Sequence, residues 1–439
     1  MSELSIGNTR LIHGNVLEVL KAMPSASVDL IVSSPPYFQL RRYPEEADIE
    51  WQDGIKCQLG LESSPELYVE HLGLILKELY RVLKPTGVFF LNIGDSYSGD
   101  MGKRKGWSYV SGLGNKKDGT AINTEARYDV PRKGLLAIPE RVLFKAMEIG
   151  FIRRNTIIWH KLNPLPSSAK DRFTNTFEYI YFFVKKPKGY YFNLDAVREP
   201  YCEATIERAM RFIKNQEHFD PSRHKHGDFM GQNPYEVFEN FVKSLIKFNI
   251  RVRDAKEGRL QAKWGDMYKA SEKEIEEYEE HPKYKECVRF GMRLPPQFNE
   301  RYFASKFDIG EINLPKKNPG DVWDITTEGF KEAHFSVFPK KLVARCIACA
   351  CPPDGVVLDP FSGSGTTAVV CELFNTKQFD KISRIETVVN LDVVKRMNWN
   401  IKCIGIDIVK DYIDMAYNRI KNEVYHGTKS LEVFAWKEV

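Results

Sequence analysis

Hydrophobic positions along the chain follow two periods, one typical of strands and one typical of helices. Residues 28–32 are apolar at nearly every position, as buried parallel strands are, and residues 67–83 repeat apolar side chains at helical spacing. The pattern continues to residue 184, breaks near 190 and returns at 334. Alternating strands and helices are typical of an α/β sheet. We therefore predict one sheet that is assembled from both ends of the chain.

The same pattern places the individual elements. Expected strands cover residues 11–13, 28–32, 88–93, 156–159, 177–184, 355–358 and 404–407; expected helices cover 16–23, 67–83, 139–147, 338–350 and 412–420, with another ending at 374. Strands 156–159 and 177–184 are expected to pair antiparallel. Lys84, Pro85, Thr86 and Gly87 predict a helix stop and a turn, and residues 375–400 read as an irregular insertion.

Two polar regions interrupt the sheet pattern. Residues 98–133 are rich in Gly, Lys and Arg and predict a long, mobile, net-positive loop. Residues 195–315 are mostly polar and rich in basic and aromatic residues, which predicts an inserted second domain. The expected division is therefore 1–194, 195–315 and 316–439.

Composition excludes several classes of protein. With 43% hydrophobic and 28% charged residues in 439, the chain is expected to be globular. Because it has no run of 18 apolar residues and no secretory pattern at its N-terminus, we expect no membrane association. Eight cysteines are too sparse for a disulfide scaffold, which predicts reduced thiols and a cytoplasmic location. The net charge of +5 permits an anionic partner without requiring one.

A glycine-rich turn follows the expected strand 355–358 and opens a helix. Glycines in this position let backbone N–H groups approach a ligand at a helix N-terminus, and residues 363–368 also satisfy the dinucleotide fingerprint. A nicotinamide oxidoreductase is therefore one alternative. Asp407, at the end of the next strand, is placed to accept hydrogen bonds from ribose hydroxyls.

A second loop, Ser34-Pro35-Pro36-Tyr37, stands at the carboxyl end of the expected strand 28–32. An exocyclic amine on a heteroaromatic base is a poor nucleophile, because its lone pair is delocalised into the ring. Hydrogen bonds from the amine to the Ser34 hydroxyl and the Pro35 carbonyl would concentrate that lone pair, in a loop that the two prolines stiffen. Tyr37 would stack on the base.

Together the two loops predict a methyltransferase that uses S-adenosyl-L-methionine. The chain resembles the β-class amino-methylating DNA methyltransferases, in which the catalytic loop precedes the cofactor loop. The resemblance rests on motifs throughout the sheet domain, namely residues 34–37, 92–95, 159–164, 178–185, 334–339, 359–367 and 405–407.

This resemblance implies a Rossmann-like fold with a mixed seven-stranded sheet and an inserted target-recognition domain. It implies site-specific methylation of double-stranded DNA, with a restriction endonuclease as genetic partner. In this family Ser-Pro-Pro-Tyr usually accompanies cytosine-N4 methylation, so adenine N6 is the alternative. Ser34, Pro35, Pro36 and Tyr37 are the expected catalytic residues; Asp359, Phe361, Gly363, Gly365, Thr366 and Asp407 are the expected cofactor-binding residues.

Other features are weaker. Many relatives carry Gly-Asp where this chain has Gly14-Asn15. Cys346, Cys349 and Cys351 lie on an apolar helix and at its end, which favours buried thiols over a metal site, and no metal is expected. Expected DNA contacts are the basic loop 98–133 and the inserted domain, notably Arg208, Arg211, Arg251 and Arg253. A methyltransferase-like fold that only binds DNA is a further alternative.

Overall fold

The computed structural model describes residues 1–98, 130–131, 133–200, 260–261, 267–268, 316–328 and 339–426. The chain divides into two compact units. The first unit contains residues 1–198 and 318–439, and the second contains residues 199–317. These boundaries lie close to the predicted ones at 195 and 315.

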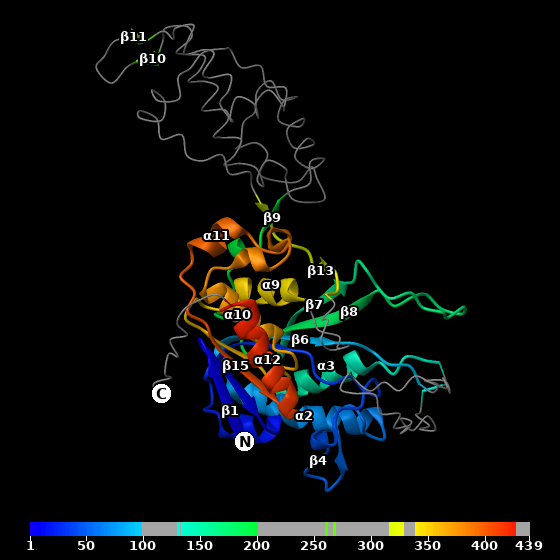
Figure 1. Ribbon diagram of the computed structural model, residues 1–439. Coiled ribbons are helices and arrows are strands. Elements are labelled where there is room, and N and C mark those ends of the chain that lie inside the picture. The colour runs from blue at the N-terminus through cyan, green and yellow to red at the C-terminus, as the bar shows by residue number, and fades with distance from the viewer. Residues whose placement is uncertain are drawn as a thin grey trace. The chain divides into compact units, whose positions relative to one another are not determined.

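A mixed sheet forms the centre of the first unit (Figure 1), and nine of its strands lie in the described residues. Their order is β1 (Ser2–Ile6), β2 (Thr9–His13), β15 (Lys402–Asp407), β14 (Val356–Asp359), β3 (Val28–Ser33), β6 (Leu83–Ile93), β8 (Phe177–Val184), β7 (Ile152–His160) and β13 (Val322–Asp324). Seven strands were expected, and β1 and β13 extend that set at its two edges.

The strand order confirms that both chain ends build the sheet. β14 and β15, from the last fifth of the chain, lie between β2 and β3. The strands from β2 to β6 run parallel, whereas β8 is antiparallel to both β6 and β7, as predicted for the 156–159 and 177–184 runs. The carboxyl ends of β3, β14 and β15 therefore meet at one edge, where ligands bind in open α/β sheets.

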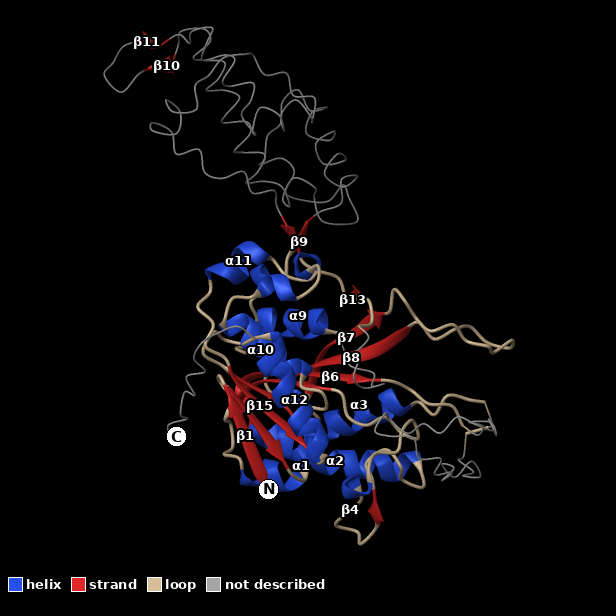
Figure 2. Ribbon diagram, viewed as in Figure 1, coloured by secondary structure: helices blue, strands red, loops and turns tan. Residues whose placement is uncertain are grey.

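Helices cover both faces of the sheet (Figure 2). On one face, α1 (Val16–Ala22), α2 (Pro65–Val82) and α3 (Ile138–Ile149) pack with the buried side chains of Ile31 and Phe89. On the other face, α9 (Lys340–Ala350), α10 (Thr366–Asn375) and α12 (Lys410–Glu423) pack with Leu30 and Phe90. Consecutive strand residues thus point to opposite helix layers, which explains why the central strands are apolar at nearly every position.

Two expectations need correction. The predicted helix stop is confirmed, because α2 ends at Val82. Lys84, Pro85, Thr86 and Gly87 do not form a turn, however, because they lie within β6, where the pairing with β3 shifts register. Val28 pairs with Leu83 and Leu30 with Val88, so the four residues form a bulge that absorbs the proline and the glycine.

The second correction concerns residues 375–400, which were expected to be an irregular insertion. The structure has short helical turns at Phe379–Lys381 and Ile385–Thr387 and the helix α11 (Leu391–Arg396). Their apolar side chains, including Val394 and Trp399, are buried in the core beside α9 and α10. The insertion therefore contains short helical elements and contributes to the core.

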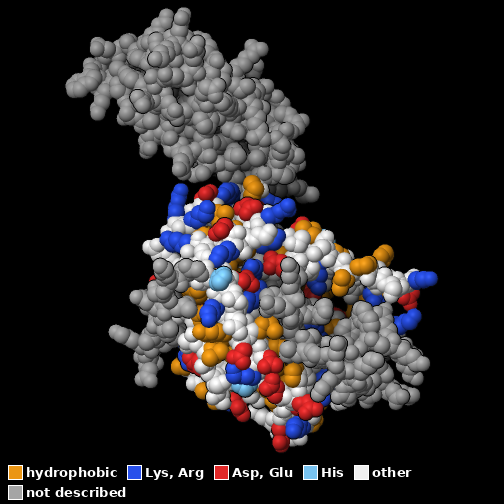
Figure 3. All heavy atoms as spheres, viewed as in Figure 1, with side chains coloured by type: hydrophobic (Ala, Val, Ile, Leu, Met, Phe, Trp, Pro, Cys, Tyr) orange, Lys and Arg blue, Asp and Glu red, His pale blue; other side chains and the backbone are white. Residues whose placement is uncertain are grey.

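Charged side chains are unevenly distributed on the face of the first unit shown in Figure 3. Lys and Arg gather around α11, whose last turn carries Lys395 and Arg396, and Asp and Glu gather toward β4 (Ile49–Glu50). No helix in the described residues is long and apolar enough to cross a membrane.

The second unit contains two short strand pairs in its described residues. β9 (Glu199–Pro200) pairs with β12 (Lys316–Lys317), and β10 (Leu260–Gln261) pairs with β11 (Met267–Tyr268). The predicted DNA contacts Arg208, Arg211, Arg251 and Arg253 lie outside the described residues, as does most of the predicted basic loop, residues 99–129.

Candidate active site

The two loops singled out in the sequence line one cavity. Ser34 and Pro36 follow β3, residues 359–364 and Thr366 follow β14, and Asp407 ends β15; all of them border the same cavity. Its empty volume, open solvent included, is about 1120 Å³. The prediction that residues 34–37 and 359–367 meet across more than 300 positions is therefore confirmed.

The two glycines of the turn differ in what surrounds them. Gly363 lines the cavity with a φ of +49°, and a Cβ placed there would meet no atom within 4 Å. Gly365 caps α10 with a φ of +74°, and its Cβ would lie 2.6 Å from the Cβ of Ala416 in α12. Gly365 is not among the residues that line the cavity, so it allows close packing of α10 on α12.

Asp407 connects the glycine turn to the residues that follow β15. Its Oδ2 accepts a hydrogen bond from the Gly363 N–H at 2.8 Å, and its Oδ1 accepts one from Val409 N–H at 2.9 Å. Burial raises the pKa of Asp407 to about 6, although these hydrogen bonds oppose the rise. The sequence suggested only a ligand contact for Asp407, so its role in fixing the glycine turn was missed.

Asp359 performs a similar task one strand away. Its carboxylate accepts a hydrogen bond from the Thr367 hydroxyl at 2.6 Å and another from Phe361 N–H at 3.2 Å. Asp359 is 1% exposed, and burial raises its pKa to about 7. The neighbouring Thr366 lines the cavity, and its hydroxyl accepts a hydrogen bond from Arg419 Nη1 at 3.0 Å.

The proline loop is held by side chains from other elements. Tyr37 Oη donates a hydrogen bond to Glu178 Oε2 at 2.7 Å and receives one from Ser34 Oγ at 3.3 Å. The pKa of Tyr37 is raised well above its usual value, first by burial and then by the negative charge of Glu178. Tyr68 Oη donates to the Pro36 carbonyl at 2.9 Å, whereas no donor from the described residues reaches the Pro35 carbonyl.

Three motifs that carried no assigned role converge on Tyr37. Asn92 Nδ2 donates to Glu178 Oε2 at 3.1 Å, and Lys161 forms an ion pair with the other carboxylate oxygen. Gly94 supports the tyrosine ring, since a Cβ at that position would lie 2.8 Å from Tyr37 Cε2. These residues come from β6, the loop after β7 and β8, so the sheet itself positions the loop.

Much of the remaining cavity wall comes from the segment between β3 and α2, which the sequence did not reveal. Arg41, Tyr43, Trp51 and Leu59 line the cavity from this segment. The side chain of Gln58 ties the part of this segment around Tyr43 to the part around Gln58. It accepts a hydrogen bond from Tyr43 N–H at 2.8 Å and donates one to the Tyr43 carbonyl at 3.0 Å.

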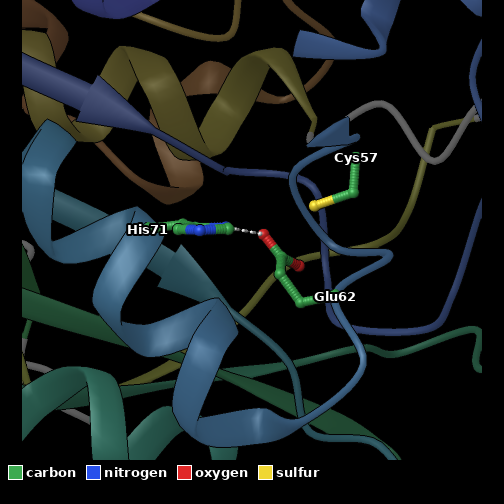
Figure 4. Close-up of side chains that lie close together, drawn as sticks. All are labelled: Cys57, Glu62 and His71. Carbon is green, nitrogen blue, oxygen red and sulfur yellow. Dashed lines mark hydrogen bonds and ion pairs between the residues drawn. The ribbon is translucent and has the colours of Figure 1, made fainter. Parts of the chain in front are cut away.

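His71 supports this wall from behind. Its Nδ1 lies 3.0 Å from Glu62 Oε1 and its Nε2 lies 3.0 Å from Asp53 Oδ2, while its ring stacks on Trp51 at 4.1 Å. Figure 4 shows Glu62 directed at His71 with the Cys57 sulfur nearby. Cys57, Glu62 and His71 have ligand atoms within 4.8 Å of one another. Both ring nitrogens already contact carboxylates, and burial raises the pKa of the Cys57 thiol to about 11. We therefore interpret the group as a hydrogen-bonded brace.

Two weaker sequence features also have positions in the structure. Asn15 lines the cavity and caps α1, since its side chain accepts a hydrogen bond from Leu17 N–H at 2.9 Å. Cys346, Cys349 and Cys351 are buried in the core, as predicted, and burial raises the pKa of each thiol.

The chain is similar in sequence to type II methyltransferases. The chain is 31% identical over 396 residues to the type II methyltransferase M.SfiI of Streptomyces fimbriatus, covering 82% of this chain and 85% of that one. It is 26% identical to the type II methyltransferase M.Cfr9I of Citrobacter freundii, and this match covers 96% of this chain and 90% of that one. A solved structure of the PvuII DNA methyltransferase, described as cytosine-N4-specific, matches 95% of this chain and 94% of its own with 16% identity and a TM-score of 0.41.

The family of N6/N4 DNA methylases matches residues 28–418, a range that includes the proline loop, the glycine turn and the segment between them. Since this match covers most of the chain, and the 31% identical relative covers a similar share, the chain belongs to the N6/N4 DNA methylase family.

Proposed function

We propose that this protein transfers a methyl group from S-adenosyl-L-methionine to the N4 amine of cytosine in double-stranded DNA, as the protective enzyme of a type II restriction–modification system. The relatives named type II methyltransferases support the biological setting, in which a restriction endonuclease is the genetic partner. Family membership decides against the nicotinamide alternative, because the glycine turn occurs here in a DNA methylase.

The residues around the cavity fit the cofactor. Open space over Gly363 leaves room for a ligand against the backbone, and the turn leads into the N-terminus of α10. Phe361 and Thr366 line the same wall, and Asp407 has lone pairs left for ribose hydroxyls after accepting two backbone hydrogen bonds. When bound, S-adenosyl-L-methionine supplies a methyl group on a positively charged sulfur, which is an electrophile.

The catalytic step falls to the proline loop. Ser34 Oγ and the Pro35 carbonyl would accept hydrogen bonds from the target amine and concentrate its lone pair on nitrogen. The observation that carries this proposal is the position of Ser34 on the wall of the cavity that Gly363 and Asp407 also line. The amine nitrogen would form a bond to the methyl carbon as the bond from that carbon to sulfur breaks, which leaves S-adenosylhomocysteine, and the nitrogen would release one proton to water.

The Ser at position 34 favours cytosine over adenine, because the chain resembles the Ser-Pro-Pro-Tyr subgroup in which cytosine-N4 methylation is usual. Adenine N6 is the second candidate, since both bases present an exocyclic amine to the same acceptors. A paired base cannot reach a cavity at a sheet edge, so it must be flipped out at a cost of about a few kcal/mol. We assign residues 199–317 to target recognition, which would offset that cost through DNA contacts.

Methyl transfer to DNA tests the proposal directly. Plasmid DNA is incubated with the protein and S-adenosyl-L-methionine carrying a deuterated methyl group, then digested and separated by mass spectrometry. Deuterated N4-methyldeoxycytidine is the expected product. N6-methyldeoxyadenosine would replace the cytosine proposal by the adenine one, and no label in DNA would support a fold that only binds DNA.

A further inference from the structure

The cavity contains an unusual arrangement of charge. Two carboxylates, Asp359 and Asp407, line it on the side of the glycine turn. Arg41 is the only Lys or Arg among the described residues that line it, and it lies on the wall between β3 and α2. The cavity thus has two carboxyl groups beside the glycine turn and one guanidinium group on the wall between β3 and α2.

Arg41 differs from its neighbour Arg42. The Arg42 guanidinium lies 3.6 Å from Asp48 and is exposed, whereas Arg41 is half-buried. Within the described residues the Arg41 guanidinium has no ion pair or hydrogen bond. Its charge acts on the phenol of Tyr43, whose raised pKa it partly lowers while Asp407 raises it further. Arg41 and Asp407 therefore both lie within electrostatic range of the Tyr43 phenol, and both line the cavity.

S-adenosyl-L-methionine has a matching distribution of charge. Its sulfonium and ammonium groups are positive, and its single negative group is the carboxylate of the methionine part. A carboxylate in a partly buried site needs a cation or several N–H donors, and the planar guanidinium of arginine can bind both carboxylate oxygens at once.

We propose that Arg41 binds the carboxylate of the methionine moiety of S-adenosyl-L-methionine. The site would therefore bind ligands that carry the amino-acid part more tightly than ligands that lack it. This inference rests on the proposed function. The wall that carries Arg41 is held in place by Gln58 and by the stacking of Trp51 on His71, so the guanidinium is presented from a braced segment.

Binding of two ligands tests the proposal without requiring methyl transfer. Affinities for S-adenosylhomocysteine, which has the carboxylate, and for 5′-methylthioadenosine, which lacks the amino-acid part, are measured by calorimetry. Charge-assisted hydrogen bonds contribute roughly 1.5–3 kcal/mol, so Arg41→Met should weaken S-adenosylhomocysteine binding by about 10- to 150-fold. Its binding of 5′-methylthioadenosine should stay within about twofold of the wild type, and Arg41→Lys should restore part of the loss.

Arg42→Met is the matched control, because it removes the same side chain one position along; both affinities should stay as in the wild type. The proposal is overturned if Arg41→Met weakens both ligands equally, which would indicate a damaged wall. It is also overturned if Arg41→Met leaves both affinities unchanged and reduces only DNA binding. A wild-type protein that binds neither ligand would contradict the proposed function itself.

Discussion

The hydroxyl of Tyr37 donates a hydrogen bond to Glu178 Oε2 at 2.7 Å, which ties the proline loop to strand β8 of the sheet. The two residues are 141 positions apart in the sequence. The Glu178 carboxylate also accepts a hydrogen bond from Asn92 Nδ2 and forms an ion pair with Lys161. The loop that would hold the target base is therefore fixed by an anion that the sheet provides.

Replacing Glu178 by Gln should slow methyl transfer without weakening cofactor binding. The loss of a charge-assisted hydrogen bond and of the Lys161 ion pair should reduce kcat by about 10- to 100-fold. Steady-state methylation kinetics and S-adenosylhomocysteine affinity measure the two effects separately.

Tyr37→Phe removes the same hydrogen bond from the other side. If Glu178 acts through Tyr37, the fold-reduction of kcat in the double variant should be smaller than the product of the two single fold-reductions. Independent, multiplicative losses would instead show that Glu178 has a role unconnected with Tyr37.

Ser34→Ala should reduce kcat by about 100-fold, the usual effect of removing one oriented hydrogen-bonding group from an active site. Affinity for S-adenosylhomocysteine should remain near that of the wild type. Ser33→Ala is a matched control, since the buried Ser33 hydroxyl has no hydrogen-bond partner in the described part of the chain. Full activity of Ser34→Ala would remove Ser34 from the mechanism.

The two glycines of the cofactor turn should respond differently to alanine. Gly365→Ala places a Cβ 2.6 Å from Ala416 Cβ at a positive φ, and should lower the free energy of unfolding by about 2–4 kcal/mol. Gly363→Ala meets no atom, so it should cost only about 1–2 kcal/mol from its φ while weakening cofactor binding. Urea unfolding and ligand titration distinguish the two. Equal destabilisation by both would contradict this assignment.

The buried carboxylate of Asp359 should make the free protein less stable as pH rises. Its pKa of about 7 lies above the 3.8 of an ordinary aspartic acid, so between these values the folded state holds more protons than the unfolded state. The free energy of unfolding should therefore fall from about pH 4 to about pH 7. Urea unfolding measures the free energy of unfolding at pH 5 and pH 8. The decrease between these two pH values should be smaller in Asp359→Asn than in the wild type. An unchanged fall would mean that other groups cause it.

The sequence predicted most of the central sheet because β3, β14 and β15 are buried on both faces and so are apolar at nearly every position. It missed β1 and β13, whose residues are partly exposed at the sheet edges and carry no such pattern. Residues 84–87 were misread as a turn because a bulge and a turn use the same proline and glycine.

The candidate site was predictable where its residues form local motifs, as at 34–37 and 359–366. The wall with Arg41 and Trp51, the brace at His71 and the Glu178 contact depend on residues brought together by the fold. Their spacing in the chain has no periodicity that identifies them. Contacts between residues so far apart in the sequence can be identified only from the three-dimensional structure.

The central claim is that two distant segments close around one cofactor. Amide hydrogen–deuterium exchange, compared with and without S-adenosylhomocysteine, measures this directly. We expect slower exchange on binding in peptides that cover residues 34–43, 359–366 and 407–412 together. Protection confined to one of these segments, or absent from all three, would contradict the claim.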